Sequence, residues 1–340
     1  VHEVLQNKRK VLLSATGSGK SLIVYCLVRW FIENDLDILL VVPTKALVLQ
    51  MLNDFCDYSK ANGFDVDKHS HIIMGGKEKN TTKPFIVSTW QSLTKQTVEW
   101  NNKHQVAIID ECHLAKGTEI QSLLGKCHEA EYRVGMTGSL DNSTTNEMII
   151  RGMLGDVKRV SATKDLMDSG HLTPIQIKSI ILDYSPETKD GCKNFDYKTE
   201  ISFLCQNEKR NRFMRNLALS LDKNTLLLYN LVEKHGKVLY EMIKEKAGAD
   251  SPVYFVHGGV DVDERENIRK LIESHDNAIV IASLGVFSTG ISINRLHNVI
   301  FASPTKSVVR VLQSIGRGLR LSSDKDVFTL YDIGDNLSKS

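Results

Sequence analysis

The sequence has no long apolar run, little excess charge and no closely spaced pair of cysteines. No apolar stretch reaches the roughly 20 residues that a helix needs to cross a bilayer, so a membrane-spanning protein is not expected. A formal net charge of +2 argues against a broadly basic coat for nucleic acid, but it is compatible with a local basic track. The cysteines at 26, 56, 112, 127, 192 and 205 lack metal-ligand spacing, and no signal peptide is recognisable. They are expected to be reduced thiols of a cytosolic protein.

The apolar runs instead predict an α/β protein with two domains. A length of 340 residues suffices for two ordinary domains. Short apolar runs without polar alternation predict parallel strands covered by helices on both faces. The first half has candidate strands at 11–14, 38–42, 72–74, 85–89, 106–109 and 133–137, and helices at 20–33, 45–59 and 119–129. The second half has candidate strands at 175–183, 225–230, 253–256, 278–282, 298–302 and 327–331, and helices near 207–221, 233–247, 263–274 and 306–319.

A polar stretch rich in turn residues separates the two halves, and it is punctuated by Gly152, Gly155, Gly170 and Pro174. We therefore predict a first domain over residues 1–160, a hinge over 161–174 and a second domain over 175–340. A loop is expected around Pro186 and Gly191. Because the chain begins with Val1 shortly before the first strand, it is expected to be a fragment of a longer protein.

A glycine-rich turn follows the first predicted strand. It reads Ala15-Thr16-Gly17-Ser18-Gly19-Lys20-Ser21 and opens a long apolar helix. Its two glycines allow the backbone N–H groups to curl around a polyphosphate, and the helix N-terminus adds partial positive charge. We expect Lys20 to reach the terminal phosphates and the Ser21 hydroxyl to hold Mg²⁺. The strict phosphate-loop pattern has a glycine where this chain has Ser14.

Two acidic residues end another predicted strand. The apolar run 106–109 is followed by Asp110-Glu111-Cys112-His113. Because the carboxyl ends of parallel strands share one edge, Asp110 should face the same crevice as the phosphate loop. Asp110 is a candidate for holding Mg²⁺ through water, and Glu111 for deprotonating the attacking water. His113 is a candidate sensor of the γ-phosphate, and the alternative is a helix-start histidine with a local hydrogen bond.

Three segments follow that contain hydroxyls, glycines or arginines. Gly135-Met136-Thr137-Gly138-Ser139 is either a turn that couples hydrolysis to domain movement or an ordinary tight turn. The segment 281–292 ends a strand with short side chains, so its backbone amides are expected to meet phosphates of ATP or of a nucleic acid.

The third segment, Gln313 to Arg320, places Arg317 and Arg320 on one side of a predicted helix, with Gln313 one turn earlier. Such a pair can fork onto phosphate oxygens, and an arginine across a cleft from the γ-phosphate is worth about 10³–10⁵ in rate. A solvated basic helix is the alternative.

Taken in order, these motifs resemble those of superfamily 2 helicases. The resemblance rests on seven segments spread over nearly the whole chain: Ala15–Ser21, Pro43–Leu47, Ser88–Gln91, Asp110–His113, Thr137–Ser139, Thr289-Gly290 and Gln313–Arg320. Within the superfamily, three segments are similar to the UvsW-type recombination and repair helicases of T-even phages: Asp110–Ala115, Gly138–Leu140 and Gly285–Ser292.

The resemblance implies two tandem RecA-like, doubly wound parallel-sheet domains with ATP in the cleft between them. It implies ATP binding by Thr16, Gly17, Ser18, Gly19, Lys20, Ser21, Gly290, Arg317 and Arg320. It implies Mg²⁺ binding by Ser21 and Asp110, and catalysis by Lys20, Asp110, Glu111, Arg317 and Arg320. Coupling between the lobes would fall to His113, Thr137, Ser139 and Gln313, and contacts with the nucleic-acid backbone to Thr44, Lys45, Gly75, Gly76, Thr89 and Thr289.

The implied activity is ATP-dependent translocation on branched, forked or single-stranded DNA, in the cytoplasm of the host cell if the chain is phage-encoded. Unwinding, branch migration and annealing are the implied outcomes, and single-stranded DNA-binding or recombination proteins are the implied protein partners. Alternatives inside the superfamily are the motor subunit of a restriction enzyme and an RNA helicase. A different class, an ATP-gated clamp that grips DNA without moving, also fits. A transporter ATPase does not, because its Leu-Ser-Gly-Gly-Gln signature is absent.

Overall fold

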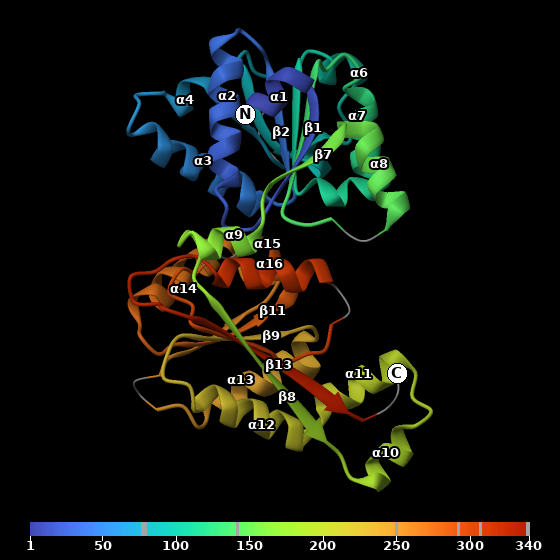
Figure 1. Ribbon diagram of the computed structural model, residues 1–340, viewed down its shortest axis with the longest axis vertical. Helices are drawn as coiled ribbons and strands as arrows, with labels where there is room; N and C mark the ends of the chain where they lie inside the picture. Colours follow the sequence, from blue (N-terminus) through green and yellow to red (C-terminus); the bar gives the residue numbers. More distant parts are fainter. Residues whose placement is uncertain (76–79, 141–142, 249–250, 291–292, 306–307, 338–340) are drawn as a thin grey trace. The chain divides into compact units, whose positions relative to one another are not determined.

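The computed structural model describes residues 1–75, 80–140, 143–248, 251–290, 293–305 and 308–337. The chain divides into two compact units, Val1–Leu166 and Met167–Ser340. Each unit is a parallel β-sheet with helices on both faces (Figure 1), so the predicted fold class is confirmed. In the described part of the chain, no helix is both long and apolar enough to cross a membrane.

The first unit is built on a seven-stranded sheet with the order β3-β4-β2-β5-β6-β1-β7. Its strands are β1 (Arg9–Ser14), β2 (Ile38–Val42), β3 (Ser70–Ile73), β4 (Phe85–Thr89), β5 (Val106–Asp110), β6 (Tyr132–Thr137) and β7 (Asp156–Ser161). Its helices are α1 (His2–Asn7), α2 (Lys20–Glu33), α3 (Lys45–Ser59), α4 (Val66–His69), α5 (Trp90–Leu93), α6 (Val98–Asn101), the 3-10 helix η1 (Cys112–Lys116), α7 (Thr118–Lys126) and α8 (Thr144–Leu154). The short helix α9 (Thr163–Asp168) crosses the boundary between the two units.

Two apolar layers hold this sheet. Every residue of β2, β4 and β5 is buried, as the continuous apolar runs predicted. On one face the layer is completed by α1, α2 and α3, and on the other by η1, α7 and α8 (Figure 1). Phe31 and Phe55 are fully buried in the first layer, and each contributes roughly 1.5–3 kcal/mol relative to an exposed side chain.

The edge strand β7 was not predicted from the sequence. It pairs in parallel with β1, but none of its side chains is buried, so it lacks the apolar run that marks the other strands. The turn into β7 requires Gly155, whose φ of 94° is left-handed. A Cβ at this position would lie 2.4 Å from the carbonyl oxygen of Arg9. The backbone of α8 and β7 therefore passes directly over the start of β1.

The second unit has a six-stranded parallel sheet with the order β10-β11-β9-β12-β13-β8. Its strands are β8 (Ile175–Asp183), β9 (Thr225–Tyr229), β10 (Val253–Val256), β11 (Ile279–Ser283), β12 (Asn298–Phe301) and β13 (Phe328–Asn336). Its helices are α10 (Pro186–Cys192), α11 (Tyr197–Gln206), α12 (Glu208–Leu219), the π-helical turn η2 (Val232–Gly236), α13 (Lys237–Lys244), α14 (Val262–Ser274), α15 (Leu284–Gly290) and α16 (Val308–Gly318).

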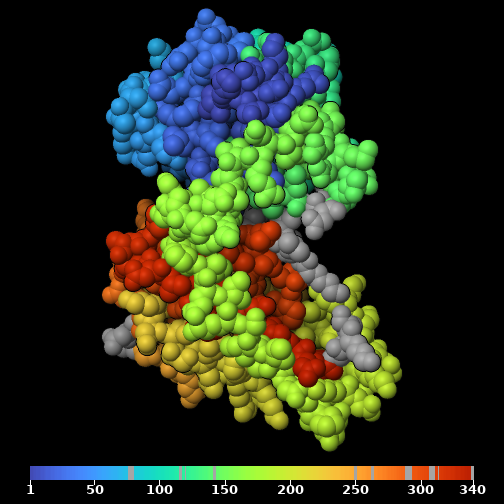
Figure 2. Space-filling view, viewed as in Figure 1, coloured from blue at the N-terminus to red at the C-terminus, as the bar shows by residue number. Residues whose placement is uncertain are grey.

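Helices α12 and α13 cover one face of this sheet, while α14, α15 and α16 lie on the other (Figure 1). The edge strand β8 is largely exposed, and Figure 2 shows it as a yellow-green strip on the surface of the unit. The loop predicted around Pro186 and Gly191 is wrong, because these residues form α10. Proline is favoured at the first position of a helix, and the Ser185 side chain caps this one by accepting a bond from the Thr188 N–H.

Candidate nucleotide site and nucleic-acid interface

The glycine-rich turn between β1 and α2 has the geometry that its sequence predicts. Gly17 and Gly19 take left-handed φ angles of 82° and 81°. Ser14 stands where the strict pattern has a glycine, and it is fully buried with its Oγ 2.6 Å from the Oγ of Ser18. Ser18 in turn donates to the Ala15 carbonyl at 2.5 Å. The serine at position 14 therefore adds a hydroxyl that hydrogen-bonds to the turn, a contact that the sequence pattern alone did not reveal.

Two side chains of the first turn of α2 reach toward this loop and its surroundings. Lys20 donates from Nζ to the Ser14 carbonyl at 3.2 Å. The Oγ of Ser21 lies 2.8 Å from the hydroxyl of Tyr58, a residue of α3 that sequence analysis did not single out. At a helix N-terminus, an ammonium can donate hydrogen bonds to phosphate, and a hydroxyl oxygen can bind the cation that accompanies it.

Asp110 and Glu111 lie at the carboxyl end of β5, two strands away from β1 in the sheet. Asp110 is 8% exposed, and burial together with the charge of Glu111 raises the pKa of its carboxyl to about 7. Lys20 opposes this shift. Glu111 has a left-handed φ of 49°, a conformation that costs a non-glycine residue about 1–3 kcal/mol and is enriched at functional sites.

The donor set at this edge fits Mg²⁺. The charge of Lys20 does not outweigh the effect of burial and of Glu111 on Asp110, and a hard cation that prefers oxygen ligands would add positive charge beside this carboxylate. Ser21 and Asp110 offer one hydroxyl and one carboxylate. Among the described residues, no group of three or more histidine, cysteine or acidic side chains is arranged to hold a metal. A Mg²⁺ here would therefore take its other ligands from phosphate and water, as this ion commonly does.

Three of the four predicted coupling residues, His113, Thr137 and Ser139, form one hydrogen-bonded group with Glu111. The Nδ1 of His113 lies 3.3 Å from Oε2 of Glu111 and 3.0 Å from Oγ1 of Thr137. Thr137 lies at the end of β6, and its hydroxyl also contacts the Ser139 carbonyl at 2.8 Å. His113, Thr137 and Ser139 are all buried, and buried polar groups are expected to be hydrogen-bonded inside the protein. The turn after β6 is therefore connected to the candidate catalytic base.

The same turn also lies against the glycine-rich loop. A Cβ placed on Gly138 would lie 3.1 Å from Oγ1 of Thr16 and 3.3 Å from Nζ of Lys20. Only a residue without a side chain allows this approach at no steric cost. Three sequence segments, after β1, β5 and β6, thus converge at one place.

The candidate nucleic-acid residues of the first unit lie at the same edge of the sheet. Thr44 caps α3 by accepting a bond from the Leu47 N–H at 3.3 Å, directly after β2. Thr89 ends β4, and its hydroxyl lies 3.0 Å from that of Ser92. Lys45 is exposed, and its Nζ lies 3.8 Å from the position that a Cβ on Gly75 would occupy, just after β3. Gly76 lies outside the described residues.

The edge therefore divides into two adjacent halves. In the strand order β3-β4-β2-β5-β6-β1-β7, the first three strands carry the candidate nucleic-acid residues. The strands β5, β6 and β1 carry the candidate nucleotide residues. Because every pairing is parallel, all six carboxyl ends open on one edge.

In the second unit, the expectation of two arginines on one side of a helix is wrong in part. Arg317 is in the last turn of α16 and is 8% exposed. The helix ends at Gly318, so Arg320 follows in a turn. Position 318 has no room for a side chain, because a Cβ there would lie 2.3 Å from the Phe328 ring. Gln313 lies within α16, as expected.

The segment 281–292 was expected to bring backbone amides to phosphates. Within it, Thr289 and Gly290 form the end of α15, which begins at Leu284 directly after β11. Any contact of Thr289 with a phosphate therefore does not use the N-terminus of this helix.

Helix α12 carries four basic residues, which could line a nucleic-acid channel or form a solvated face, and neither holds for Arg210. This side chain is 2% exposed and bonds Asp335 of β13 through Nε at 2.9 Å and Nη2 at 3.0 Å. Its Nη1 donates to the Ala302 carbonyl at 2.6 Å. Arg210 is therefore part of the structure of the second unit.

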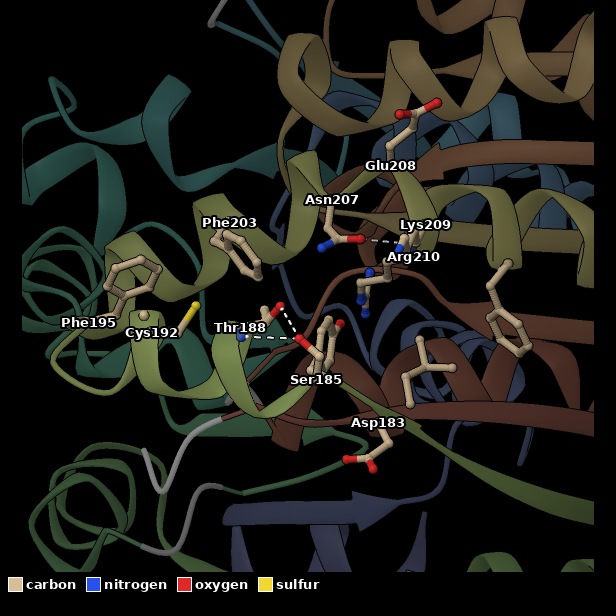
Figure 3. A pocket seen from close by; sticks show the side chains of 14 residues that line it. Asp183, Ser185, Thr188, Cys192, Phe195, Phe203, Asn207, Glu208, Lys209 and Arg210 are labelled. Atoms are coloured by element: carbon tan, nitrogen blue, oxygen red, sulfur yellow. Dashed lines mark hydrogen bonds between the residues drawn. The ribbon is translucent and has the colours of Figure 1, made fainter.

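Arg210 also contributes to the wall of a cavity of about 740 Å³ in the second unit (Figure 3). The cavity lies between the end of β8 and helices α10, α11 and α12. Aromatic side chains dominate its lining, namely Tyr184, Phe195, Phe203 and Phe213. Asp183, Glu208 and Lys209 add charges of both signs.

Comparisons with known proteins identify the family of this chain. Residues 2–142 match the family described as type III restriction enzyme, res subunit, and residues 208–322 match the helicase conserved C-terminal domain. The ATP-dependent DNA helicase UvsW of Enterobacteria phage T4 is 37% identical over 344 residues, which cover 99% of this chain and 67% of UvsW. The chain belongs to the UvsW family of superfamily 2 helicases. As a member of this family, the chain is an ATP-dependent DNA helicase, which confirms the predicted enzyme class.

Solved structures extend the comparison. A crystal structure of T4 UvsW is 34% identical, covers 98% of this UvsW-family chain and 65% of its own, and has a TM-score of 0.42. The chain thus spans about two thirds of the length of UvsW. A fragment of a putative HsdR subunit of a type I restriction enzyme from Vibrio vulnificus YJ016 is 17% identical, with 97% and 61% coverage and a TM-score of 0.68. The latter likeness shows that the fold is shared.

Proposed function

We propose that this chain is the motor of a helicase that uses ATP and Mg²⁺ to move along branched or forked DNA. The observation that carries the proposal is the divided edge of the first sheet, where residues for nucleotide and for nucleic acid lie on adjacent strands. A change at the nucleotide half can reach the other half through the β5–β2 pairing. The sequence relation to UvsW supports DNA as the substrate.

In the proposed chemistry, Thr16 to Ser21 hold the phosphates of ATP with backbone N–H groups and the Lys20 ammonium. Mg²⁺, when bound near Ser21 and Asp110, neutralises phosphate charge. Glu111 orients the attacking water and accepts its proton, and His113 and Thr137 hold the Glu111 carboxylate in place. The position of Glu111 at the end of β5 suits a carboxylate that takes the proton from the attacking water.

We assign residues 1–160 and 175–340 to two motor domains and 161–174 to the hinge. Arg317 and Arg320 of the second domain complete the ATP site, with Gly290 near the nucleotide and Gln313 as a coupling residue. Thr44, Lys45, Gly75, Gly76, Thr89 and Thr289 contact the DNA backbone, which is a sequence-independent mode of binding. Recombination and repair intermediates are the proposed substrates, in the host cytoplasm, with single-stranded DNA-binding or recombination proteins as partners.

The test is ATP hydrolysis by the purified chain with matched single-stranded, duplex, forked and four-way-junction DNA, and with RNA as the control. We expect the forked and junction DNAs to stimulate hydrolysis most. Stimulation by RNA alone would overturn the DNA assignment. Stimulation by every DNA equally would remove the branched-substrate proposal but leave the motor.

Glu111→Gln separates a motor from an ATP-gated clamp. The variant keeps the shape of the side chain but cannot accept a proton, so we expect a loss of about 10²–10⁴ in the rate of DNA-stimulated hydrolysis. ATP binding should persist. Undiminished hydrolysis would show that Glu111 is not the base. Parent-like movement of a fork by the variant would contradict the hydrolysis-driven mechanism.

A further inference from the structure

Three successive carbonyl groups, one at the last residue of α16 and two just after it, are each bonded by a residue from elsewhere in the second unit. The carbonyl of the last helical residue has no partner inside the helix and must be satisfied from outside. The Gly318 carbonyl accepts from Nζ of Lys325 at 2.9 Å. The carbonyls of Leu319 and Arg320 accept from the backbone N–H and the side-chain hydroxyl of Thr173, at 2.8 Å and 3.2 Å. These carbonyls belong to the segment that carries Arg317 and Arg320.

Thr173 belongs to the segment that leads into β8. It is fully buried, so its hydroxyl bond to Arg320 is shielded from water. The next residue, Pro174, accepts a bond from the Phe328 N–H at 2.9 Å, which ties the same segment to the start of β13. The backbone of Leu319 and Arg320 is therefore attached to a chain segment more than a hundred residues earlier, at a fixed point of the sheet.

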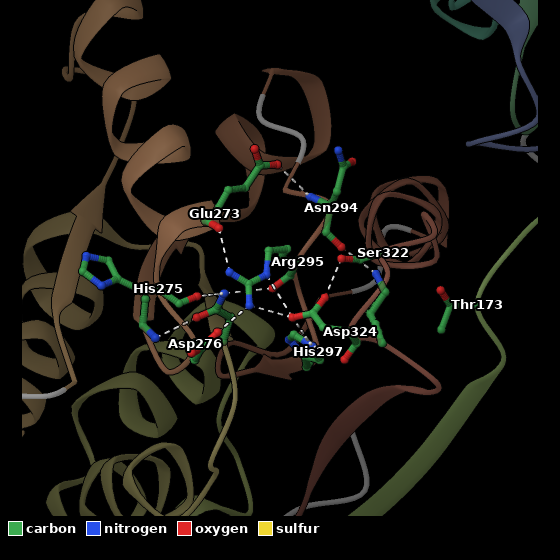
Figure 4. Close-up of polar contacts among 12 residues, drawn as sticks. Thr173, Glu273, His275, Asp276, Asn294, Arg295, His297, Ser322 and Asp324 are labelled. Atoms are coloured by element: carbon green, nitrogen blue, oxygen red, sulfur yellow. Dashed lines mark hydrogen bonds and ion pairs between the residues drawn. The ribbon is translucent and has the colours of Figure 1, made fainter.

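Lys325 is 5% exposed and donates a second bond, to the Asn294 carbonyl at 2.8 Å. The loop that carries it is also held by the neighbouring Asp324, which accepts bonds from Arg295 at 2.9 Å and from Ser322 at 2.5 Å (Figure 4). Burial lowers the pKa of the Lys325 ammonium to about 8. Lys325 therefore links the arginine segment to the stretch that follows α15.

We propose that Thr173 and Lys325 are positioning residues for Arg317 and Arg320, because their three bonds set the backbone from which both arginines project. The inference rests on the proposed role of these arginines in ATP hydrolysis. It adds that their placement depends on the segment before β8. A displacement of Thr173 pulls on two consecutive carbonyls and so moves the Arg320 backbone with it.

The test compares Thr173→Val with Thr173→Ser in the full chain. Valine keeps the volume and removes only the hydroxyl donor, while serine retains it. We expect Thr173→Val to lower kcat for DNA-stimulated ATP hydrolysis about three- to tenfold, with KM for ATP changed less than about twofold. Thr173→Ser should restore most of kcat.

Thr225→Val is the control, because Thr225 is also fully buried in the second unit and donates its hydroxyl to the Lys223 carbonyl at 2.8 Å, while accepting from Asn298 at 3.3 Å. It should lower the unfolding temperature at least as much as Thr173→Val does but leave kcat unchanged. Equal effects of the two valine variants on both kcat and unfolding temperature would reduce Thr173 to a structural role and overturn the inference.

Lys325→Met tests the remaining bond, and it should lower kcat at unchanged KM if the chain folds. Arg320→Ala distinguishes this inference from the proposed function. It should bind ATP nearly normally and hydrolyse it about 10³-fold more slowly. Normal hydrolysis by Arg320→Ala would contradict the arginine role itself. A slow Arg320→Ala beside an unaffected Thr173→Val would contradict only the positioning role.

Discussion

The Nδ1 atom of His113 lies 3.0 Å from the hydroxyl oxygen of Thr137. His113 is in η1, just after β5, and Thr137 is the last residue of β6. Both atoms also lie within 3.5 Å of Oε2 of Glu111. Glu111, the proposed catalytic base, is thus hydrogen-bonded to Thr137, which begins the turn that is proposed to couple hydrolysis to domain movement.

Thr137→Val is expected to weaken this link without removing the proposed base. Glu111 and His113 keep their own contact at 3.3 Å, so hydrolysis should fall by less than about tenfold. Movement of a DNA fork should fall much more, because the turn no longer bonds to His113. The measurement is the number of ATP molecules consumed per base pair unwound. A proportional loss of both activities would contradict a coupling role.

Gly138→Ala is expected to weaken ATP binding. A methyl group would lie 3.1 Å from Oγ1 of Thr16 and 3.3 Å from Nζ of Lys20, so the loop must shift by a few tenths of an ångström. We expect KM for ATP to rise by a few-fold, on the order of 1 kcal/mol, with a smaller change in kcat. Gly125→Ala is the control, because no atom lies within 4 Å of a Cβ there. An unchanged KM for Gly138→Ala would show that the turn yields freely.

Arg210→Met should strongly destabilise the second unit. It leaves the carboxylate of Asp335, which is 5% exposed, without its bidentate partner, and breaking such a pair costs about 3–5 kcal/mol. Hydrogen exchange in β13 measures the loss. Tryptophan fluorescence is an internal control, because Trp30, Trp90 and Trp100 all lie in the first unit and should report little change.

The double variant Arg210→Met with Asp335→Leu checks the cause of that loss. Removing the stranded carboxylate should recover a large part of the lost stability, because a buried ion pair can often be replaced by apolar groups at little cost. A double variant less stable than Arg210→Met alone would show that Asp335 has another essential partner. Tyr184, which donates to Asp335 at 2.6 Å, is the first such candidate.

His235 should make the second unit less stable in mild acid. Burial, with a smaller contribution from the charge of Arg210, lowers the pKa of its imidazole to about 3. The unfolded chain takes up a proton near pH 6.5 that the folded chain does not, so stability is complete above that pH and falls as the pH drops toward 3. The loss is about 2 kcal/mol at pH 5. Urea unfolding followed by hydrogen exchange in α13 measures it.

His235→Gln should flatten that pH dependence, since glutamine does not titrate and can still contact Asn211. His128→Gln is the matched control, because the His128 side chain is 55% exposed and lies in the first unit. An unchanged slope in His235→Gln would assign the acid sensitivity to other groups.

The parts of the fold that follow from local chemistry were predicted from sequence. The strands at 38–42 and 85–89 have the predicted bounds, because a continuous apolar run can only be covered on both faces. The apolar runs were enough to predict the fold class, and the order of seven short segments, from Ala15–Ser21 to Gln313–Arg320, was enough to predict the helicase family. Each of these signals lies in a short stretch of the sequence.

What was missed depends on contacts between distant residues or on polar surroundings. The Arg210–Asp335 pair joins residues 125 positions apart, and a basic residue in a helix looks the same whether it is paired or solvated. Strand β7 is exposed and polar, so only its pairing with β1 defines it. Thr173 gave no signal because its role comes from Arg320, which is distant in the sequence.

The single hydrogen-bonded seam between β2 and β5 separates the two halves of the first sheet's edge. Loops after β2, β3 and β4 can vary in length and charge without altering β5 and β6, which carry Asp110 and Thr137, or β1, which leads to Lys20 at the start of α2. Under the proposed roles, related proteins could therefore evolve to bind a different kind of nucleic acid while the residues for ATP hydrolysis stay the same. An engineer who wishes to retarget this motor should graft on the β3-β4-β2 side and leave the β5-β6-β1 side intact.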